Sequence, residues 1–262
     1  MNIFVFDIET VPDVASARRL WNLSDLDDDA VAEVMYNKRQ QETSGGTTFM
    51  RHYLHQIVAI SVAFRNDDRF KLWSLGEEDS SEEEIVRRFF EGIERYTPTL
   101  VSWNGGGFDM PVLHYRALFH GVCAPQYWDT GNENPSFRYN NYLGRFHWRH
   151  IDLMDVLSGY QPRAFAPLDQ IAGMLGFPGK LDMTGSGVEE RFRAGDIKAI
   201  RDYCETDVLN TYLIFLKFQH MRGELQVGHL QEELERVRKY LVESGEQHLA
   251  NFLASWDQMA MP

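Results

Sequence analysis

Cysteine, positive charge and long apolar runs are all scarce in this sequence of 262 residues. Its two cysteines provide neither a disulfide framework nor a zinc-binding spacing, so we expect a reduced, cytoplasmic location. No apolar run is long enough to cross a bilayer, and we expect no membrane partner. Asp7 and Glu9 interrupt the only apolar segment at the N-terminus, which argues against a secretory signal.

Basic residues are also outnumbered, with 26 lysines and arginines against 39 aspartates and glutamates and a formal net charge of −13. This balance argues against a protein that coats long nucleic acid by neutralising its phosphates. It does not exclude an enzyme that grips a short end, because local charge and bound cations can reverse the global sign.

The chain does contain apolar segments that alternate with amphipathic ones. Strands are predicted at 2–8, 56–64, 70–75 and 99–104, with a short one near the start of 150–158. Helices are predicted at 80–96, from Asp109 onward, and at about 167–176, 196–221 and 228–255, while 14–50 reads as a charged insertion of helix and loop. This order predicts an α/β domain with a mixed sheet flanked by helices.

The last predicted helix carries one apolar stripe, formed by Leu230, Leu234, Val237 and Leu241. The stripe is expected to pack on the same domain, and a surface for a partner is the alternative.

Acids stand at or near the ends of several predicted elements. Asp7 and Glu9 are two positions apart on a strand, so both side chains point to the same face. Asp109 follows a strand and three glycines, near the start of a helix. Tyr203 and Asp207 are four residues apart and therefore share one face of a helix, at the edge of its buried stripe.

Bringing these acids together is unfavourable without a cation. Two like charges about 4 Å apart repel by roughly 4 kcal/mol at an effective dielectric of 20. Oxygen ligands suit Mg²⁺ or Mn²⁺ better than zinc. Two such ions form a known arrangement for stabilising the attacking and leaving oxygens at phosphorus. The sequence therefore predicts a site for a pair of divalent ions.

Each of these residues also has an ordinary structural interpretation. Asp7 and Glu9 could cap a neighbouring helix or face solvent. Asp109 could be only a helix N-cap, since a proline two residues later suits a helix start. Tyr203 could be an aromatic residue of the core.

Three motifs carry a family resemblance: "FDIET", "NGGGFDMPVL" and "YCETDV". They resemble the exonuclease motifs of the DEDD 3′–5′ exonucleases, within the DnaQ-like or ribonuclease H-like superfamily. In particular, the chain is similar to the predicted exonucleases related to the proofreading domain of family B DNA polymerases. Tyr203, four residues before Asp207, is typical of the DEDDy branch; the histidine of the other branch would stand where this chain has Asp202.

The resemblance implies a ribonuclease H-like fold, with an exonuclease domain at 1–217, the helical insertion within it, and a helical extension at 218–262 packed on the same domain. The implied metal ligands are Asp7, Glu9, Asp109 and Asp207. Tyr203 would orient the attacking water, and these five residues would form the catalytic set. Substrate contacts are expected at Thr10, Asn104 and Phe108.

The function implied is a metal-dependent 3′–5′ exonuclease that uses two Mg²⁺ or Mn²⁺ ions. It would release nucleoside 5′-monophosphates from 3′ ends of single-stranded nucleic acid, with DNA favoured and RNA possible. One alternative is a catalytically weak subunit that binds nucleic-acid ends in a repair or replication complex, and another is an exoribonuclease acting on short RNA. No polymerase domain is expected in this chain, so any link to a polymerase would need a protein partner.

The segment 137–150 combines five aromatic residues with three arginines and no acid. Stacking faces interleaved with cations suit single-stranded nucleic acid, with Arg145 and Arg149 as contacts. Alternatively, the rings pack down and the arginines pair with local acids. Asp152 and Asp155 nearby are expected to be structural.

Overall fold

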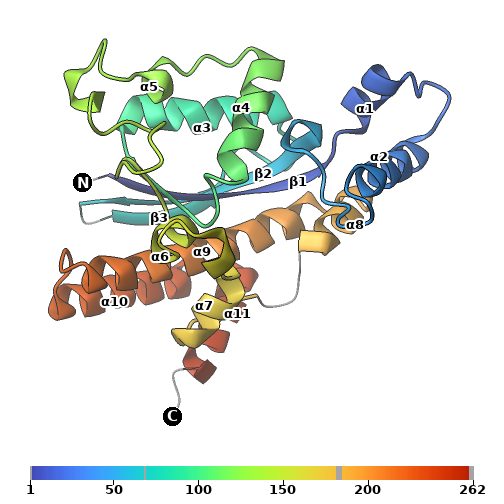
Figure 1. The fold of residues 1–262 in the computed structure, drawn as a ribbon. Coiled ribbons are helices and arrows are strands. Elements are labelled where there is room, and N and C mark those ends of the chain that lie inside the picture. The colour runs from blue at the N-terminus through green and yellow to red at the C-terminus, as the bar shows by residue number, and fades with distance from the viewer. Residues whose placement is uncertain (1, 68, 181–184, 260–262) are drawn as a thin grey trace.

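The computed structural model describes residues 2–67, 69–180 and 185–259. A five-stranded sheet lies between two layers of helices (Figure 1), with strand order β3-β2-β1-β4-β5. The strands are β1 (Ile3–Pro12), β2 (His55–Asn66), β3 (Arg69–Ser74), β4 (Thr99–Ser102) and β5 (His150–Asp152). β1 pairs antiparallel with β2 and parallel with β4, while β2–β3 is antiparallel and β4–β5 parallel. The predicted α/β class with a mixed, ribonuclease H-like sheet is confirmed.

Alternation along the central strand β1 divides its side chains between two cores. Phe4 and Phe6 belong to one core, which α3 (Glu82–Tyr96), α4 (Asp109–His120) and α5 (Pro125–Trp128) cover. Val5 belongs to the other core, which is formed with α9 (Ile197–Met221). Since Asp7 and Glu9 share the parity of Val5, the strand directs both acids to the side of α9.

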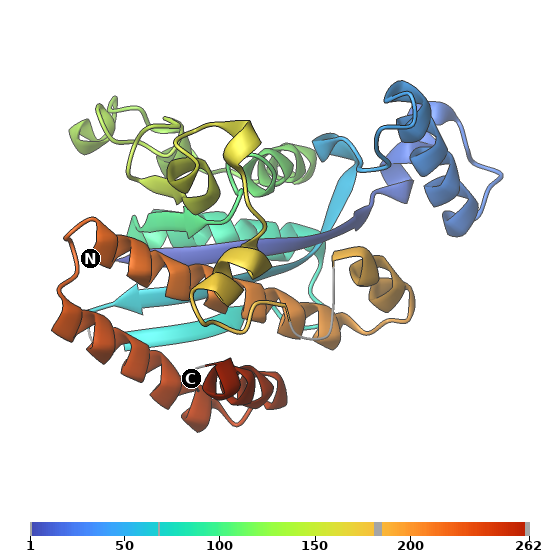
Figure 2. The same ribbon diagram turned by 60° about the horizontal axis from the view of Figure 1, so that its bottom comes forward.

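The predicted insertion is a helical arm that extends from the ends of β1 and β2 (Figure 2). It contains α1 (Val14–Trp21), α2 (Asp28–Glu42) and the short η1 (His52–Leu54). Asp13 and Asp27 cap the two helices by accepting backbone hydrogen bonds. The arm has a small apolar core of its own, formed by Ala17, Val31, Met35, Met50 and Leu54.

Short elements connect β4 to α9. They are η2 (Pro135–Phe137), α6 (Leu153–Leu157), η3 (Pro162–Ala164), α7 (Leu168–Met174), η4 (Gly185–Gly187) and α8 (Val188–Arg193).

The predicted single helix at 228–255 is wrong: the structure has α10 (Val227–Ser244) and α11 (Gln247–Met259). Gly245, with a φ of 74°, ends α10 in the left-handed conformation that glycine adopts without strain. The apolar stripe of α10 is buried against the sheet and α9, so the predicted packing is confirmed. Within the described residues, no helix combines the length and apolar character of a membrane span.

Candidate active site

Two of the acids lie inside β1, because the strand continues to Pro12 instead of ending near residue 8 as predicted. Asp7 lies opposite Ser61 of β2, and Glu9 opposite Ala59. The pairing shifts by one residue between Glu9 and Thr10. Such a bulge bends a strand and changes the direction of its side chains, and bulges often occur beside active sites.

The glycine turn before α4 places the third acid. The Asp152 carboxylate accepts backbone hydrogen bonds from Asn104 and Gly106, both at 2.9 Å, and this fixes the turn. Asp109 is the first residue of α4, and its Oδ1 accepts a hydrogen bond of 3.2 Å from the backbone N–H of Ile8. The side chain of Asp109 therefore reaches β1 between the other two acids. Asp152 has the structural role expected of it.

Helix α9 crosses the sheet and supplies the fourth acid together with the tyrosine. Tyr203, Cys204 and Asp207 are all buried. The Cys204 Sγ lies 3.4 Å from the Asp7 carbonyl oxygen and 3.6 Å from its Oδ2. Ligand atoms of Asp7, Glu9 and Cys204 lie within 4.8 Å of one another; this group of three includes neither Asp109 nor Asp207.

The four acids act on one another electrostatically. Burial raises the pKa of Asp7 well above its usual value, and the charges of Asp109, Glu9 and Asp207 raise it further. Burial also raises the pKa of Asp109 to about 7 and that of Asp207 to about 6. The Oδ1 of Asp207 is buried without a hydrogen-bond partner in the described part of the chain. A buried carboxylate oxygen without a partner is costly, and a cation would remove that cost.

Tyr203 and Lys180 complete the electrostatic setting. Burial and the charges of Asp207, Glu9 and Asp7 raise the pKa of Tyr203, so its hydroxyl keeps its proton and can donate. Burial raises the pKa of Glu9 and of Asp207, and the positive charge of Lys180 opposes this rise at both. Sequence reasoning missed Lys180 because a single lysine in a loop carries no motif. Cys204 was missed as well, because a free cysteine on the buried face of a helix is ordinary.

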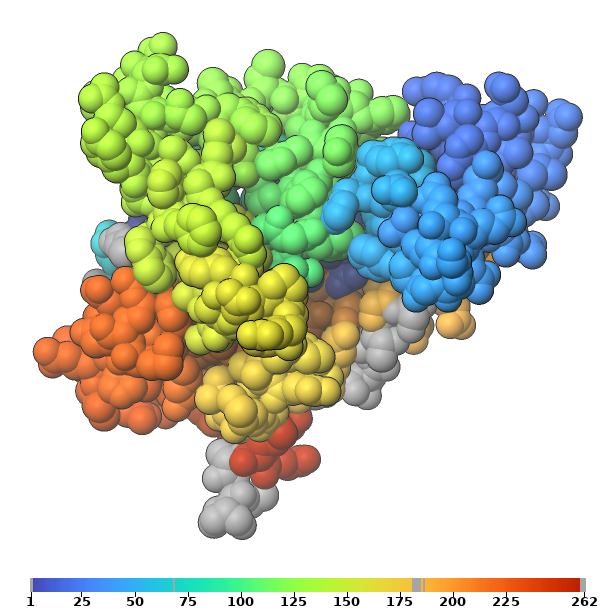
Figure 3. Space-filling model, in the orientation of Figure 1, coloured from blue at the N-terminus to red at the C-terminus, as the bar shows by residue number. Residues whose placement is uncertain are grey.

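The residues expected to contact substrate belong to the segments that carry the acids, and these segments meet at a hollow of the surface (Figure 3). In Figure 3, dark-blue atoms of the first strand are visible at its floor, between the green start of α4, light-blue atoms of the arm and orange atoms of α9. Thr10 Oγ1 lies 2.9 Å from His55 Nδ1, and the Phe108 ring contacts the His55 ring edge to face at 5.1 Å. Asn104 and Phe108 are half-buried, so parts of both remain accessible.

The two arginines of the 137–150 segment make contacts within the chain. Arg145 donates two hydrogen bonds to Asp155, at 2.6 and 2.7 Å. Arg149 donates to the Asn140 carbonyl, and its guanidinium lies 4.3 Å from the centre of the Phe137 ring. These contacts favour the packing interpretation for both arginines, and contact with a substrate stays a prediction.

A mixed sheet with interacting acids from β1, α4 and α9 is an arrangement that suits divalent ions and chemistry at phosphorus. Residues 47–256 match the model of a family described as predicted 3′–5′ exonucleases related to the exonuclease domain of PolB. The chain belongs to this family, and it carries an exonuclease domain of the phosphodiester hydrolase class. The matched range contains Asp109, Tyr203 and Asp207, whereas Asp7 and Glu9 precede it.

Known DNA polymerases are similar over part of their length. The chain is 25% identical to the DNA polymerase of Archaeoglobus fulgidus over 172 residues, which cover 64% of this chain and 21% of that protein. It is 28% identical to the catalytic subunit of DNA polymerase epsilon from Saccharomyces cerevisiae over 155 residues, or 54% of this chain and 6% of that protein. The alignments therefore span only a small part of these relatives.

Proposed function

We propose that this protein is a metal-dependent 3′–5′ exonuclease that removes nucleoside 5′-monophosphates from single-stranded nucleic acid, with DNA the favoured substrate. The observation that supports this most is the convergence of four carboxylates from three elements, with one oxygen of Asp207 left without a partner among the described residues.

The donors fit divalent ions of the Mg²⁺ or Mn²⁺ type. Asp7, Glu9, Asp109 and Asp207 would hold them through carboxylate oxygens, the ligands these hard cations prefer. When bound, two such ions would neutralise the converging charge, activate water and stabilise both reacting oxygens at phosphorus. The raised pKa values of Asp109 and Asp207 support this role, because a bound cation stabilises the ionised form.

The residues around the acids would hold and orient the substrate. Tyr203 keeps its hydroxyl proton and would hydrogen-bond the water that attacks the terminal phosphodiester. The backbone of Thr10, adjacent to Glu9, would meet the terminal 3′-hydroxyl. Asn104 and Phe108 would contact the terminal nucleotide from the opposite rim, beside Asp109.

End-labelled DNA and RNA oligomers, each with one strand end blocked, test the proposal. We expect mononucleotides from an open 3′ end, with Mg²⁺ or Mn²⁺ and not with EDTA, and no release by Asp7→Ala. Release from a strand whose 3′ end is blocked would contradict the polarity. Binding of 3′ ends without release by the wild type would instead support an end-binding subunit of a repair or replication complex.

A further inference from the structure

Phe49, in the segment that returns from α2 to β2, has 54% of its surface exposed. Its ring centre lies 5.4 Å from that of Phe108 and 5.4 Å from that of His55. A single exposed apolar residue is ordinary on a protein surface. This one, however, belongs to a group of rings that begins at Phe108, the residue directly before Asp109.

The ring group is fixed to both sides of the catalytic hollow. His52 Nε2 lies 2.9 Å from the Gly107 carbonyl oxygen, which joins the arm to the glycine turn. His55 Nδ1 lies 2.9 Å from Thr10 Oγ1, which joins it to β1 beside Glu9. The Phe49 ring is thus held at a defined position relative to the acids, while about half of the residue's surface remains exposed.

A second aromatic pair continues outward. Tyr53 and Tyr115 meet edge to face with ring centres 6.2 Å apart, and both are exposed. Tyr115 follows Asp109 by six residues on α4, a helical rise of about 9 Å. Accessible rings therefore extend from the catalytic end of α4 along its outer side.

In a chain with a net charge of −13, phosphate neutralisation is a poor source of affinity for nucleic acid. Stacking of bases on aromatic rings provides affinity without a basic surface, and it tolerates any base sequence. We propose that Phe49, beside Phe108, is a stacking platform for a nucleobase near the 3′ end of the strand, and that the Tyr53–Tyr115 pair receives bases upstream of it. This inference rests on the proposed function and adds the part of the substrate that is recognised.

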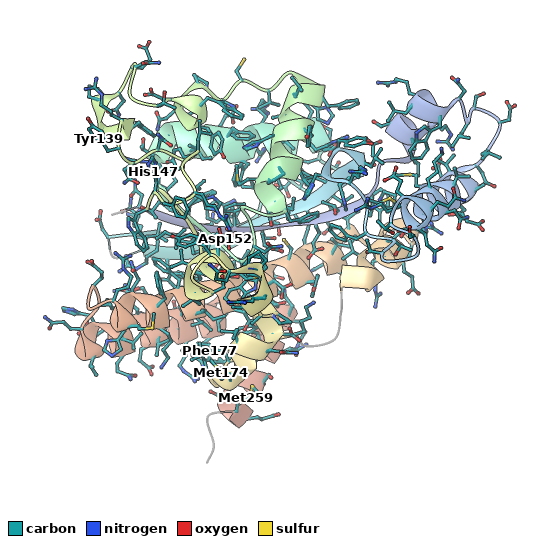
Figure 4. The ribbon with its side chains drawn as sticks, in the orientation of Figure 1. Tyr139, His147, Asp152, Met174, Phe177 and Met259 are labelled. Atoms are coloured by element: carbon teal, nitrogen blue, oxygen red, sulfur yellow. The ribbon has the colours of Figure 1, made fainter. Side chains whose placement is uncertain are left out.

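Kinetics on a single-stranded DNA oligomer, compared with oligomers that carry one abasic nucleotide at successive 3′ positions, test the platform. Phe49→Ala is expected to raise KM by roughly fivefold or more with little change in kcat. On the oligomer that lacks the base stacked on Phe49, the wild type should show the same rise in KM. On that oligomer Phe49→Ala should raise KM no further. Trp128→Ala is the matched control, because Trp128 is 52% exposed, close to the 54% of Phe49, and belongs to α5, which packs on α3 at the opposite end of the view from the arm (Figure 4). Its KM should equal that of the wild type.

Two conservative variants separate stacking from packing. Phe49→Trp keeps a flat ring and should keep KM, whereas Phe49→Leu keeps an apolar cover on His55 and should lose affinity as alanine does. The inference would be overturned if Phe49→Leu kept the KM of the wild type, or if Phe49→Ala left KM unchanged. It would also be overturned if KM rose equally on every abasic oligomer. If the wild type releases no mononucleotide, the proposed function fails; fluorescence anisotropy with the same oligomers then replaces KM and decides on the platform separately.

Discussion

Two groups of buried acids include residues of β1 or the residue directly after it, and their charges are compensated in different ways. Asp13, directly after the strand, and Glu82, at the start of α3, both contact Arg116, with the Arg116 Nε 2.7 Å from Glu82 Oε1. Arg116 is the one buried arginine among the described residues. Around Asp7 the described residues provide no buried arginine: burial with mutual repulsion raises the pKa of Asp7, and the charge of Lys180 opposes the rise at Glu9 and Asp207. The first group is balanced by Arg116, whereas in the second group one oxygen of Asp207 has no hydrogen-bond partner among the described residues, and the proposed function assigns a cation to it.

The largest expected effect is on activity at the second group. Asp7→Asn should lower mononucleotide release by about three orders of magnitude, because it removes a charged ligand from a site that acts as a unit. In EDTA the variant should be at least as stable as the wild type, since one repelled charge is gone. Release assays and thermal unfolding check the two parts. If Asp7→Asn kept its activity, or were clearly less stable than the wild type in EDTA, the two groups of acids would not differ in the way described.

Removing the cation of the first group should have the opposite signature. Arg116→Met is expected to lower the free energy of unfolding by about 3–5 kcal/mol, because it leaves two buried carboxylates uncompensated. Urea unfolding measures this loss. Arg87→Met serves as the control, since its pair with Glu91 is largely exposed and should contribute less than about 1 kcal/mol. If Arg116→Met and Arg87→Met lowered the free energy of unfolding equally, the buried ion pairs would contribute no more stability than an exposed one.

Metal ions and pH should change stability through the acids around Asp7 and not through the acids that contact Arg116. In the metal-free protein, burial raises the pKa of Asp109 to about 7 and that of Asp207 to about 6, both from 3.8. Carboxyls with raised pKa contribute stability that is complete below pH 3.8 and is lost as the pH rises through 6 and 7. Divalent ions bind the ionised form, so the gain in melting temperature on adding Mg²⁺ should be larger at about pH 8 than at about pH 5.5.

A concentration of Mg²⁺ one hundred times Kd corresponds to about 2.7 kcal/mol of added stability. Differential scanning calorimetry at both pH values, with EDTA as the baseline, provides the comparison. Asp7→Asn should reduce the gain. No gain at either pH, or the larger gain at the lower pH, would contradict a carboxylate metal site.

The smallest effect is expected at Arg145, whose side chain is 53% exposed although that of its partner Asp155 is only 12% exposed. Arg145→Ala should cost less than about 1 kcal/mol of stability. If the arginine serves only Asp155, KM and its salt dependence stay unchanged, and the substrate-clamp interpretation of 137–150 fails. A raised KM with a weaker salt dependence would instead support the clamp.

Local spacing was enough to predict which of the candidate site residues share a face of a strand or a helix, while their catalytic roles stay predictions. The two-residue period of a strand places Asp7 and Glu9 together, and the i, i+4 spacing of a helix does the same for Tyr203 and Asp207. The mixed sheet followed from the order of strands and helices. The division of the chain into 1–217 and 218–262 stays a prediction.

Contacts between distant segments could not be predicted in this way. Cys204 lies beside Asp7 only because α9 crosses under β1, and Phe49 reaches Phe108 only because the arm folds back on the glycine turn. The break at Gly245 was missed for a different reason. Gly228 lies inside α10 while Gly245 ends it, so the residue type alone does not decide where a helix stops.

The arm leaves and rejoins the sheet at neighbouring points, since Pro12 pairs with His55 and the Asp13 amide donates to the Leu54 carbonyl at 2.9 Å. In topological terms it is an elaborate hairpin loop closed by a strand pair, and its length does not alter the register of the strands that hold Asp7 and Glu9. Under the proposed function, exchange of this loop between related chains would change the surface offered to a nucleic-acid strand, while Asp7 and Glu9 stay in place.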